Sequence, residues 1–380
     1  MNLIVNLIPI KKGGGQQVAS NFINQSLKNK NHNILFLVTS ETYCHTLLKD
    51  LDADFISINN SISSRIFFQY FKLPFIIKRN KTDVLYTMFG PGLNFKNIIS
   101  ITGCAYSNIF YPEIDFWSDY SFKQRIKLKL IDYYRLKTTL ASDAIIFENR
   151  SMQERSIKLY NFPKERTKLI LPSISDYKFE NNDSFVKSLN SINSNNFNIL
   201  LLTGWHKNKN IEIVPLILYE IQKQGRYDIS FVITVHINHP DSVKLYNEAV
   251  KLKVDKNIVF LGSVEPHNIP NLFQKIQAVG LFSLLESFSN NIIESWYFKK
   301  PLFISNEEWS KSICNEAAIY VQRDDPKDIS NKILEFLDDN SFKKNLKKQI
   351  ENELLKYPDP REKVIQQFEF IEEIYQYKNG

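Results

Sequence analysis

Residues 278–305 read AVGLFSLLESFSNNIIESWYFKKPLFIS. The apolar run at 278–284 predicts a buried strand, a helical pattern begins near Ser289, and a second apolar run at 302–304 predicts another strand. Two strands that are connected by a helix usually lie parallel to each other in a sheet. Both runs are continuously apolar, which indicates strands that are buried on both faces. This stretch therefore predicts a parallel sheet that is covered by helices.

The same alternation extends in both directions from this stretch. Further strands are predicted at 3–8, 34–38, 84–87, 98–101 and 144–147 in the first half, and at 197–203, 229–235 and 258–261 in the second. Between the halves, residues 176–196 are rich in Asn and Ser, as in a surface connection between domains. We expect an α/β protein with two doubly wound, Rossmann-like domains at 1–180 and 196–357.

Two further features complete the predicted architecture. A break at Pro358 and Pro360 precedes an amphipathic helix at 361–377, so residues 358–380 are expected to pack back on the first domain. Two facing sheets of similar design predict a central cleft, and ligands of open α/β sheets bind beyond the carboxyl ends of the strands.

Composition limits the classes of function. With 380 residues, 43% hydrophobic and 23% charged, the chain is long and apolar enough for two folded domains. Its formal net charge of +7 favours anionic partners. Three dispersed cysteines indicate neither a disulfide framework nor a metal site, and the absence of a long apolar run leaves a cytoplasmic protein as the expectation.

A pair of glutamates brackets the start of the helix near Ser289. Glu286 precedes it, and Glu294 follows after seven intervening residues, just over one turn inside the helix. The free amides and positive dipole end of that helix form a favourable seat for a diphosphate. The two carboxylates could then accept hydrogen bonds from a sugar on one side and a ribose on the other. Alternatively, both are ordinary solvated acids at a helix end.

The run 257–305 resembles the donor-binding half of the retaining glycosyltransferases of family four, which adopt the GT-B fold. The resemblance rests on a set of motif positions in the family's order: Gly262, Pro270, Ser283, Glu286, Glu294, Lys300 and Pro301. It implies a nucleotide-diphosphate sugar as substrate and no cofactor or metal, with Glu286 as the catalytic residue that positions the sugar. Ser289, Asn290, Asn291 and Glu294 would bind the donor, Glu294 through the ribose.

The loop after the first strand of the second domain departs from the family. Its sequence LLTGWHKNKN places Lys209 at the family's lysine position, whereas Trp205 or His206 stands where an arginine is usual. Lys207 could replace the missing cation beside the donor's diphosphate. A solvated loop is the alternative reading of both lysines.

Two regions of the first domain could face the ligands. Gly14 and Gly15 follow the first strand, where glycine lets a phosphate approach the backbone, although any Rossmann-like unit tolerates such a turn. Tyr106, Ser107 and Asn108 follow another strand and suit an acceptor sugar. The family's usual histidine and aspartate are missing near this loop, so the sequence assigns no catalytic base.

The stretch 121–140 alternates basic and apolar residues. Two interpretations stay open: a peripheral contact with an anionic membrane at the inner face of the cell membrane, where a lipid-linked acceptor would lie, and an ordinary solvated helix face.

The function expected from the resemblance is transfer of a sugar, with retention, to a glycan or lipid-linked acceptor in the synthesis of a bacterial surface polysaccharide such as O-antigen or capsule. A GT-B epimerase or hydrolase, or a non-catalytic partner subunit, is the alternative. Nucleic-acid binding is disfavoured because the basic residues are dispersed and carry no recognised motif.

Overall fold

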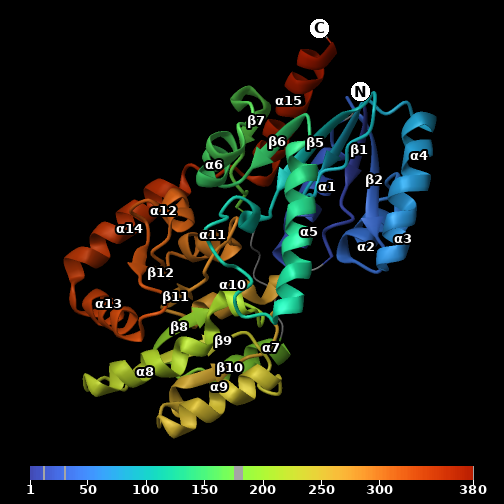
Figure 1. The fold of residues 1–380 in the computed structure, drawn as a ribbon. Helices are drawn as coiled ribbons and strands as arrows, with labels where there is room; N and C mark the ends of the chain where they lie inside the picture. Colours follow the sequence, from blue (N-terminus) through green and yellow to red (C-terminus); the bar gives the residue numbers. More distant parts are fainter. Residues whose placement is uncertain (12, 30, 175–182, 380) are drawn as a thin grey trace. The chain divides into compact units, whose positions relative to one another are not determined.

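The computed structural model describes residues 1–11, 13–29, 31–174 and 183–379 (Figure 1). The chain forms two compact units: unit 1 comprises Met1–Ser175 with Tyr357–Gly380, and unit 2 comprises Asp176–Lys356. Part of the connection predicted at 176–196 lies outside the described residues. The α/β class with two doubly wound domains is confirmed, whereas the expected cleft, and the acceptor and donor roles of the two halves, stay predictions.

Unit 1 contains a seven-stranded sheet in the order β3-β2-β1-β4-β5-β6-β7, with every neighbouring pair parallel. The strands are β1 (Asn2–Asn6), β2 (Asn33–Thr39), β3 (Phe55–Ile58), β4 (Val84–Thr87), β5 (Ile99–Cys104), β6 (Ala144–Phe147) and β7 (Thr167–Leu169). The helices are α1 (Gly14–Ser26), α2 (Tyr43–Asp50), α3 (Ile62–Phe67), the π-helix η1 (Phe68–Lys72), α4 (Leu73–Arg79), α5 (Phe122–Leu140), α6 (Arg150–Tyr160) and α15 (Pro360–Asn379).

Burial explains which strands of unit 1 the sequence predicts. Every residue of the central strands β4, β5 and β6 is buried, and these strands appear in the sequence as continuous apolar runs. The sequence analysis missed β3 and β7, which lie at the two edges of the sheet and are partly exposed. An edge strand needs fewer apolar residues, so its periodic signal is weak.

The last helix of the chain belongs to the core of unit 1. Phe368 of α15 packs against Phe22 of α1 with ring centroids 5.8 Å apart, and Ile371 is fully buried beside them. Lys363 forms a buried ion pair with Glu148, which follows β6, at 2.5 Å between Nζ and Oε1. One face of the first sheet is thus completed by residues from the far end of the chain.

Unit 2 contains a six-stranded parallel sheet in the order β10-β9-β8-β11-β12-β13. The strands are β8 (Phe197–Leu201), β9 (Ile229–Ile233), β10 (Ile258–Phe260), β11 (Ala278–Leu281), β12 (Leu302–Ser305) and β13 (Ile319–Val321). The helices are α7 (Asp183–Ser188), α8 (Val214–Lys223), α9 (Pro240–Lys251), α10 (Ile269–Gln274), α11 (Asn290–Tyr297), α12 (Glu308–Cys314), α13 (Pro326–Asp338) and α14 (Asn340–Leu354).

Among the helices of the described residues, none is both long and apolar enough to cross a bilayer.

A glycine in β5 is required by the close approach of β4. A Cβ added at Gly103 would lie 1.9 Å from the carbonyl oxygen of Met88, whereas one added at Gly204 would meet no atom within 4 Å. We predict that Gly103→Ala lowers the free energy of unfolding by about 3 kcal/mol or more, because the backbone of a buried strand cannot yield. Gly204→Ala should change it by less than about 1 kcal/mol. Equal urea midpoints for the two variants would contradict this packing.

Candidate functional site

In both sheets the strand order reverses at the centre, between β1 and β4 in unit 1 and between β8 and β11 in unit 2. At such a switch point the connections leave toward opposite faces of the sheet, and a crevice opens beyond the carboxyl ends of the strands. In unit 2 the expected crevice lies between the segment after β8 and the segment that joins β11 to α11. Lys207, Lys209 and Ser289, predicted to bind the donor, lie in these two segments, and Asn290, Asn291 and Glu294 follow in α11. Gly14 and Gly15, also predicted to bind the donor, lie in unit 1.

The segment after β8 is a compact double turn. Lys207–Lys209 form one turn of 3₁₀-helix (η5), Asn210 adopts a left-handed conformation with φ of 53°, and Ile211–Ile213 form a second such turn (η6) that leads into α8. The Asn210 side chain donates a hydrogen bond of 2.7 Å to the backbone oxygen of Arg323, which follows β13. Asparagine tolerates the left-handed region better than most residues, and here its amide also fixes the turn to the sheet edge.

Asn208 joins this turn to the segment after β11. Its Nδ2 donates to the backbone oxygen of Leu285 at 2.8 Å, and its Oδ1 accepts from the Leu285 amide at 3.0 Å. The backbone oxygen of Asn208 accepts from the Leu284 amide at 2.9 Å. These three bonds hold the two loops in one register, so the side chain of Lys209 is placed against Glu286.

Lys209 and Glu286 form the central ion pair of the crevice. Nζ of Lys209 lies 2.5 Å from Oε1 of Glu286, with 23% and 14% of the respective side chains exposed. A pair that is largely shielded from water is screened less than a surface pair. An ammonium carries three hydrogens, so Lys209 can bind a phosphate oxygen while it retains Glu286.

His206 lies beside this pair as a neutral ring. Burial, reinforced by the charge of Lys209, lowers the pKa of His206, and the charge of Glu286 only partly opposes the shift. Its Nδ1 accepts a hydrogen bond of 3.1 Å from the Asn208 amide, which places the proton of the neutral ring on Nε2. The ring therefore adds no positive charge beside the pair.

The amino end of α11 begins where the sequence predicts it. Ser289 is the N-cap residue in an extended conformation, and its side chain makes no capping hydrogen bond in the structure as described. Asn290 opens the helix and Asn291 donates a hydrogen bond of 2.8 Å to the backbone oxygen of Leu202, which ties α11 to the end of β8. Glu294 is only 5% exposed, so it is a buried carboxyl and not a solvated acid at a helix end.

The two lysines of the loop after β8 have different surroundings. Lys207 is exposed, and its charge contributes to the lowered pKa of Asp241, for which the hydrogen bond from Lys244 is the main cause. Lys209, in contrast, is paired with Glu286. The structure thus brings Lys209 to the glutamate motif and places Lys207 near the start of α9.

Trp205 is one of two candidates, with His206, for the position where an arginine was expected. Its Nε1 donates to Oγ of Ser242 at 2.7 Å, and its ring stacks on His239 with centroids 5.8 Å apart. The indole is held against α9, so it adds an aromatic surface to the loop and no positive charge.

Arg323 is a cation at this sheet edge that the sequence analysis did not nominate. Its side chain is 15% exposed, and its Nε donates to the backbone oxygen of Phe282 at 3.3 Å. Burial raises the pKa of Glu307, and the charge of Arg323 opposes that shift. Arg323 follows β13, and its place after a strand of the same sheet could have identified it. That strand has only three residues, too few to be recognised from the sequence.

In unit 1 the predicted glycines and the acceptor-side residues lie after separate strands. Gly14 and Gly15 open α1, and Gly13 precedes them with φ of 72°. Tyr106, Ser107 and Asn108 follow β5 and are tied to α5, since the Asn108 amide donates to Asp132 at 2.6 Å. The guanidinium of Arg135 lies 4.3 Å from the centroid of the Tyr106 ring. These side chains therefore border α5.

The thiol of Cys104, at the end of β5, is unsuited to nucleophilic chemistry. Burial raises its pKa to about 12, and a backbone hydrogen bond involving Tyr106 offsets only part of this. A thiol with such a pKa stays protonated at neutral pH, and the thiolate is the reactive form.

Comparison with known proteins follows from this geometry. Residues 186–353 match the family model described as Glycosyl transferases group 1. The match covers all of the segments that build the crevice of unit 2. No curated protein matches the chain in sequence.

Solved structures resemble both units. A glycosyltransferase from Rickettsia africae superposes with a TM-score of 0.73 at 15% identity, covering 98% of each chain. The Anabaena protein HepE in complex with UDP and glucose gives 0.70 at 15% identity, covering 98% of this chain and 100% of that one. WaaG, a glycosyltransferase involved in lipopolysaccharide biosynthesis, gives 0.70 at 13%, covering 96% and 98%. At such low identity the likeness shows the fold, which is GT-B.

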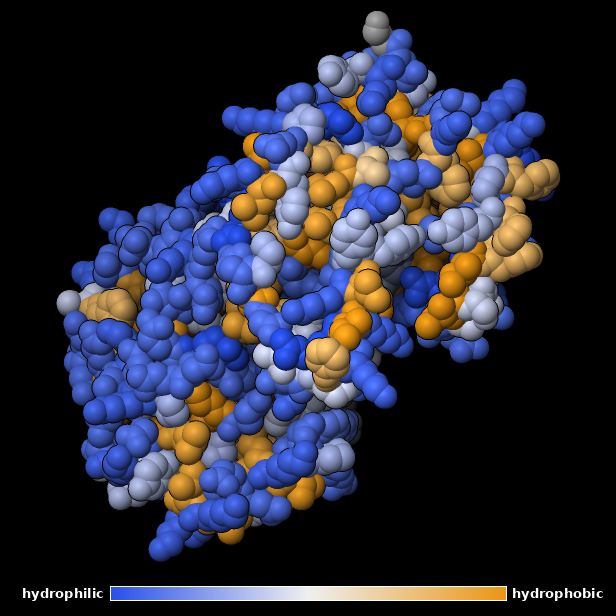
Figure 2. All heavy atoms as spheres, viewed as in Figure 1, coloured by the Kyte–Doolittle hydropathy of each residue, from blue (hydrophilic) through white to orange (hydrophobic). Residues whose placement is uncertain are grey.

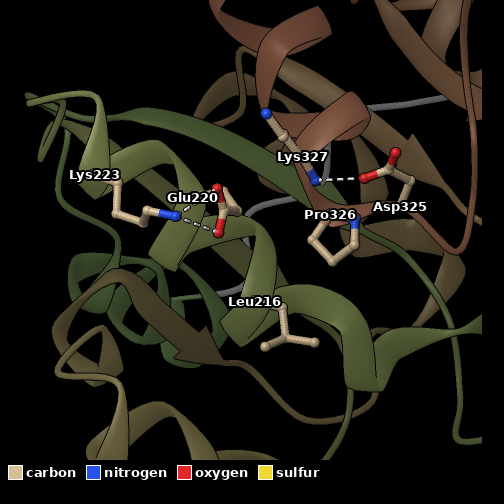
Figure 3. A pocket seen from close by; sticks show the side chains of 6 residues that line it. All are labelled: Leu216, Glu220, Lys223, Asp325, Pro326 and Lys327. Carbon is tan, nitrogen blue, oxygen red and sulfur yellow. Dashed lines mark hydrogen bonds and ion pairs between the residues drawn. The ribbon is translucent and has the colours of Figure 1, made fainter.

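A pocket of about 280 Å³ lies elsewhere in unit 2, between α8 and the start of α13. Figure 3 shows its lining, which is Leu216, Glu220, Lys223, Asp325, Pro326 and Lys327. The polar groups there already bond to one another: Lys223 pairs with Glu220, and Asp325 accepts from the Lys327 amide. No residue predicted from the sequence to bind a ligand lines this pocket.

The Asn208 contacts give a test of the site's framework. Asn208→Ala removes two side-chain hydrogen bonds to Leu285 and a longer one to Glu286, and should lower the free energy of unfolding by about 2 kcal/mol. The matched control is Asn247→Ala at an exposed position in α9, which should have no measurable effect. Identical melting temperatures for the two variants would show that Asn208 does not hold the loops together.

Proposed function

We propose that this protein is a glycosyltransferase that moves a sugar from a nucleotide-diphosphate sugar to an acceptor hydroxyl. The Lys209–Glu286 pair carries the proposal, because it lies at the switch point of a parallel sheet beside the amino end of α11. The family match over residues 186–353 supports it. So do the HepE structures, in which that protein holds UDP and UDP-glucose.

In this proposal the site acts mainly on the leaving group. Negative charge accumulates on the diphosphate as the bond to the anomeric carbon breaks. Lys209 supplies a cation, and the backbone amides that begin α11 at Ser289, Asn290 and Asn291 supply oriented dipoles. Lys207, which is exposed in the same turn, is placed to meet the charge from the solvent side.

The two glutamates have separate roles. Glu286 accepts hydrogen bonds from the transferred sugar and fixes its anomeric carbon relative to the leaving group. Glu294, buried one turn inside α11, accepts from the ribose of the nucleotide. Lys209 can donate to a phosphate oxygen while it stays paired with Glu286, so donor binding and sugar positioning are coupled through one ion pair.

Acceptor binding is assigned to unit 1. Tyr106, Ser107 and Asn108 offer the acceptor an aromatic face and polar groups, while Gly14 and Gly15 let the donor's phosphate approach the backbone. The acceptor is a glycan or a lipid-linked glycan in the assembly of a bacterial surface polysaccharide. WaaG, whose fold this chain shares, is a glycosyltransferase involved in lipopolysaccharide biosynthesis. We place the protein in the cytoplasm, at the inner face of the membrane.

Retention of anomeric configuration is part of the proposal. It is measured by proton NMR of the first-formed product, where the coupling constant of the anomeric proton distinguishes the two configurations. A product with the same configuration as the donor is expected, and an inverted product would contradict the retaining mechanism while leaving transfer itself intact.

Donor binding is tested by thermal stabilisation with a panel of nucleotide sugars, since a ligand that binds only the folded state raises its stability. Lys209→Met should weaken binding of the stabilising donor about ten- to a hundred-fold, because the variant loses one hydrogen bond to a charged group of the donor. The control Lys256→Met removes an equal charge at an exposed position just before β10, at the opposite edge of the sheet. If the donor stabilises the wild type and both variants to the same extent, Lys209 does not take part in donor binding.

Turnover is tested with Glu286→Gln. This variant should still be stabilised by the donor, whereas transfer should fall about a hundred-fold because the sugar is no longer held in place. Glu265→Gln, exposed after β10, is the control and should keep full activity.

Turnover of the donor by the wild type without any acceptor would instead indicate an epimerase or hydrolase. Donor binding without turnover in any assay would indicate a partner subunit.

A further inference from the structure

Helix α5 exposes an apolar stripe. Only Thr139 of its 19 residues is buried. Phe122, Ile126, Leu130 and Tyr133 are 76%, 47%, 64% and 65% exposed, and their spacing of four, four and three residues puts them on one face of the helix. Large apolar side chains in such a row normally pack against a partner, and in the described part of the chain this row faces solvent.

A second apolar face is formed by α3, η1 and α4. One side of this segment packs into the core through Phe68, Leu73 and Ile77. The other side exposes Ile62 and Phe71 by 75% and 69%, and further exposed apolar residues are Ile66, Phe67, Tyr70 and Phe75. The rings of Phe67 and Phe71 stack at 5.3 Å, so the exposed rings form an ordered cluster.

The two faces form one surface. Tyr134 of α5 lies close enough to Tyr70 of η1 to raise the pKa of the Tyr70 hydroxyl. Figure 2 shows apolar side chains gathered over α5 and over α3 and α4 on the same side of unit 1. We call the exposed residues of 62–79 and 122–140 the apolar–basic surface. Contiguous apolar patches of this kind on a folded protein mark a site of interaction.

The charges of these two segments are predominantly positive, although Asp115, outside them, pairs with Arg125 and Lys129 of α5. Residues 62–79 contain four basic residues and no acid, and residues 122–140 contain six basic residues and one acid. That acid, Asp132, is engaged by Arg135 at 2.9 Å and by the side chains of Asn108 and Trp117. Lys123 and Lys127 are exposed next to the apolar stripe of α5. The surface is therefore strongly positive around an aromatic and aliphatic centre.

We propose that the apolar–basic surface docks unit 1 on a lipid bilayer that contains anionic phospholipids. Exposed Phe and Ile side chains enter the boundary between headgroups and acyl chains, tyrosines lie at headgroup level, and lysines meet the phosphates. A protein partner fits less well, because the centre of protein interfaces is depleted in lysine, whereas here lysines alternate with the apolar residues.

The inference deepens the proposed function by naming the surface on which a lipid-linked acceptor would be met. Docking is nevertheless measured without donor or acceptor. Failure of vesicle binding would leave sugar transfer to a soluble acceptor intact, and failure of transfer would leave vesicle binding intact, so the two proposals can be separated.

The experiment is co-sedimentation of the full chain with vesicles of phosphatidylcholine alone, or of phosphatidylcholine mixed with phosphatidylglycerol. We expect binding to the mixed vesicles that weakens as salt rises, because screening reduces the attraction of exposed charges. Equal binding to both vesicles, or binding to neither, would overturn the proposal. Light scattering tests for a dimer that forms as the protein concentration rises. If variants of this surface lose such a dimer but still bind vesicles normally, the surface binds a second copy of the chain.

Two matched pairs of variants locate the docking surface. Phe67→Ser with Phe71→Ser and Phe75→Ser should weaken binding to mixed vesicles by about ten-fold or more. Tyr227→Ser with Leu355→Ser and Tyr377→Ser changes three similarly exposed side chains elsewhere and should leave binding unchanged.

The second pair tests charge. Lys123→Gln with Lys127→Gln should weaken binding about twenty-five-fold, roughly five-fold for each lysine at an anionic surface. Lys344→Gln with Lys348→Gln makes the same change in net charge on α14 and should have little effect. If both lysine pairs weaken binding equally, the attraction depends on net charge alone and the assignment to α5 is wrong.

Discussion

The contact between the loops after β8 and β11 is the constraint on which the site depends. The loop after β11 has no regular structure and the loop after β8 has only two short turns of 3₁₀-helix, and a parallel sheet leaves the two loops free to diverge at the switch point. The Asn208 side chain joins them through paired hydrogen bonds to the Leu285 backbone, and the Lys209–Glu286 ion pair follows from that register. The placement of this ion pair in unit 2 therefore depends on an uncharged side chain.

The two candidates for the expected arginine position are Trp205 and His206. Trp205 is bound to α9 and brings no charge. Arg323 returns a guanidinium to the sheet edge from β13, although it bonds the backbone of Phe282 and so supports the loop in preference to a ligand. Positive charge in the crevice rests mainly on Lys209 and on the amino end of α11.

Central strands and the start of α11 could be predicted from sequence because burial on both faces leaves continuous apolar runs, and because a cap residue precedes a periodic helix. Edge strands such as β3, β7 and β13 could not, since partial exposure removes that signal. The sequence motifs identified Glu286 and Lys209 as candidates in two separate loops. Their pairing, and the Asn208 bonds that support it, join residues that are 77 positions apart in the sequence, so it could not be predicted. The exposed face of α3 escaped notice because its apolar residues resemble those of a core helix.

The position of α15 has a consequence for how the chain is made. Phe368 and Ile371 complete the core of unit 1, and Lys363 pairs with the largely buried Glu148, yet these residues leave the ribosome after the whole of unit 2. Unit 2, encoded by one continuous segment, is synthesised in full while unit 1 still lacks a helix and the Glu148 carboxylate lacks its cation. During translation the second unit can mature first, and the amino-terminal unit keeps an exposed apolar face until α15 has been made.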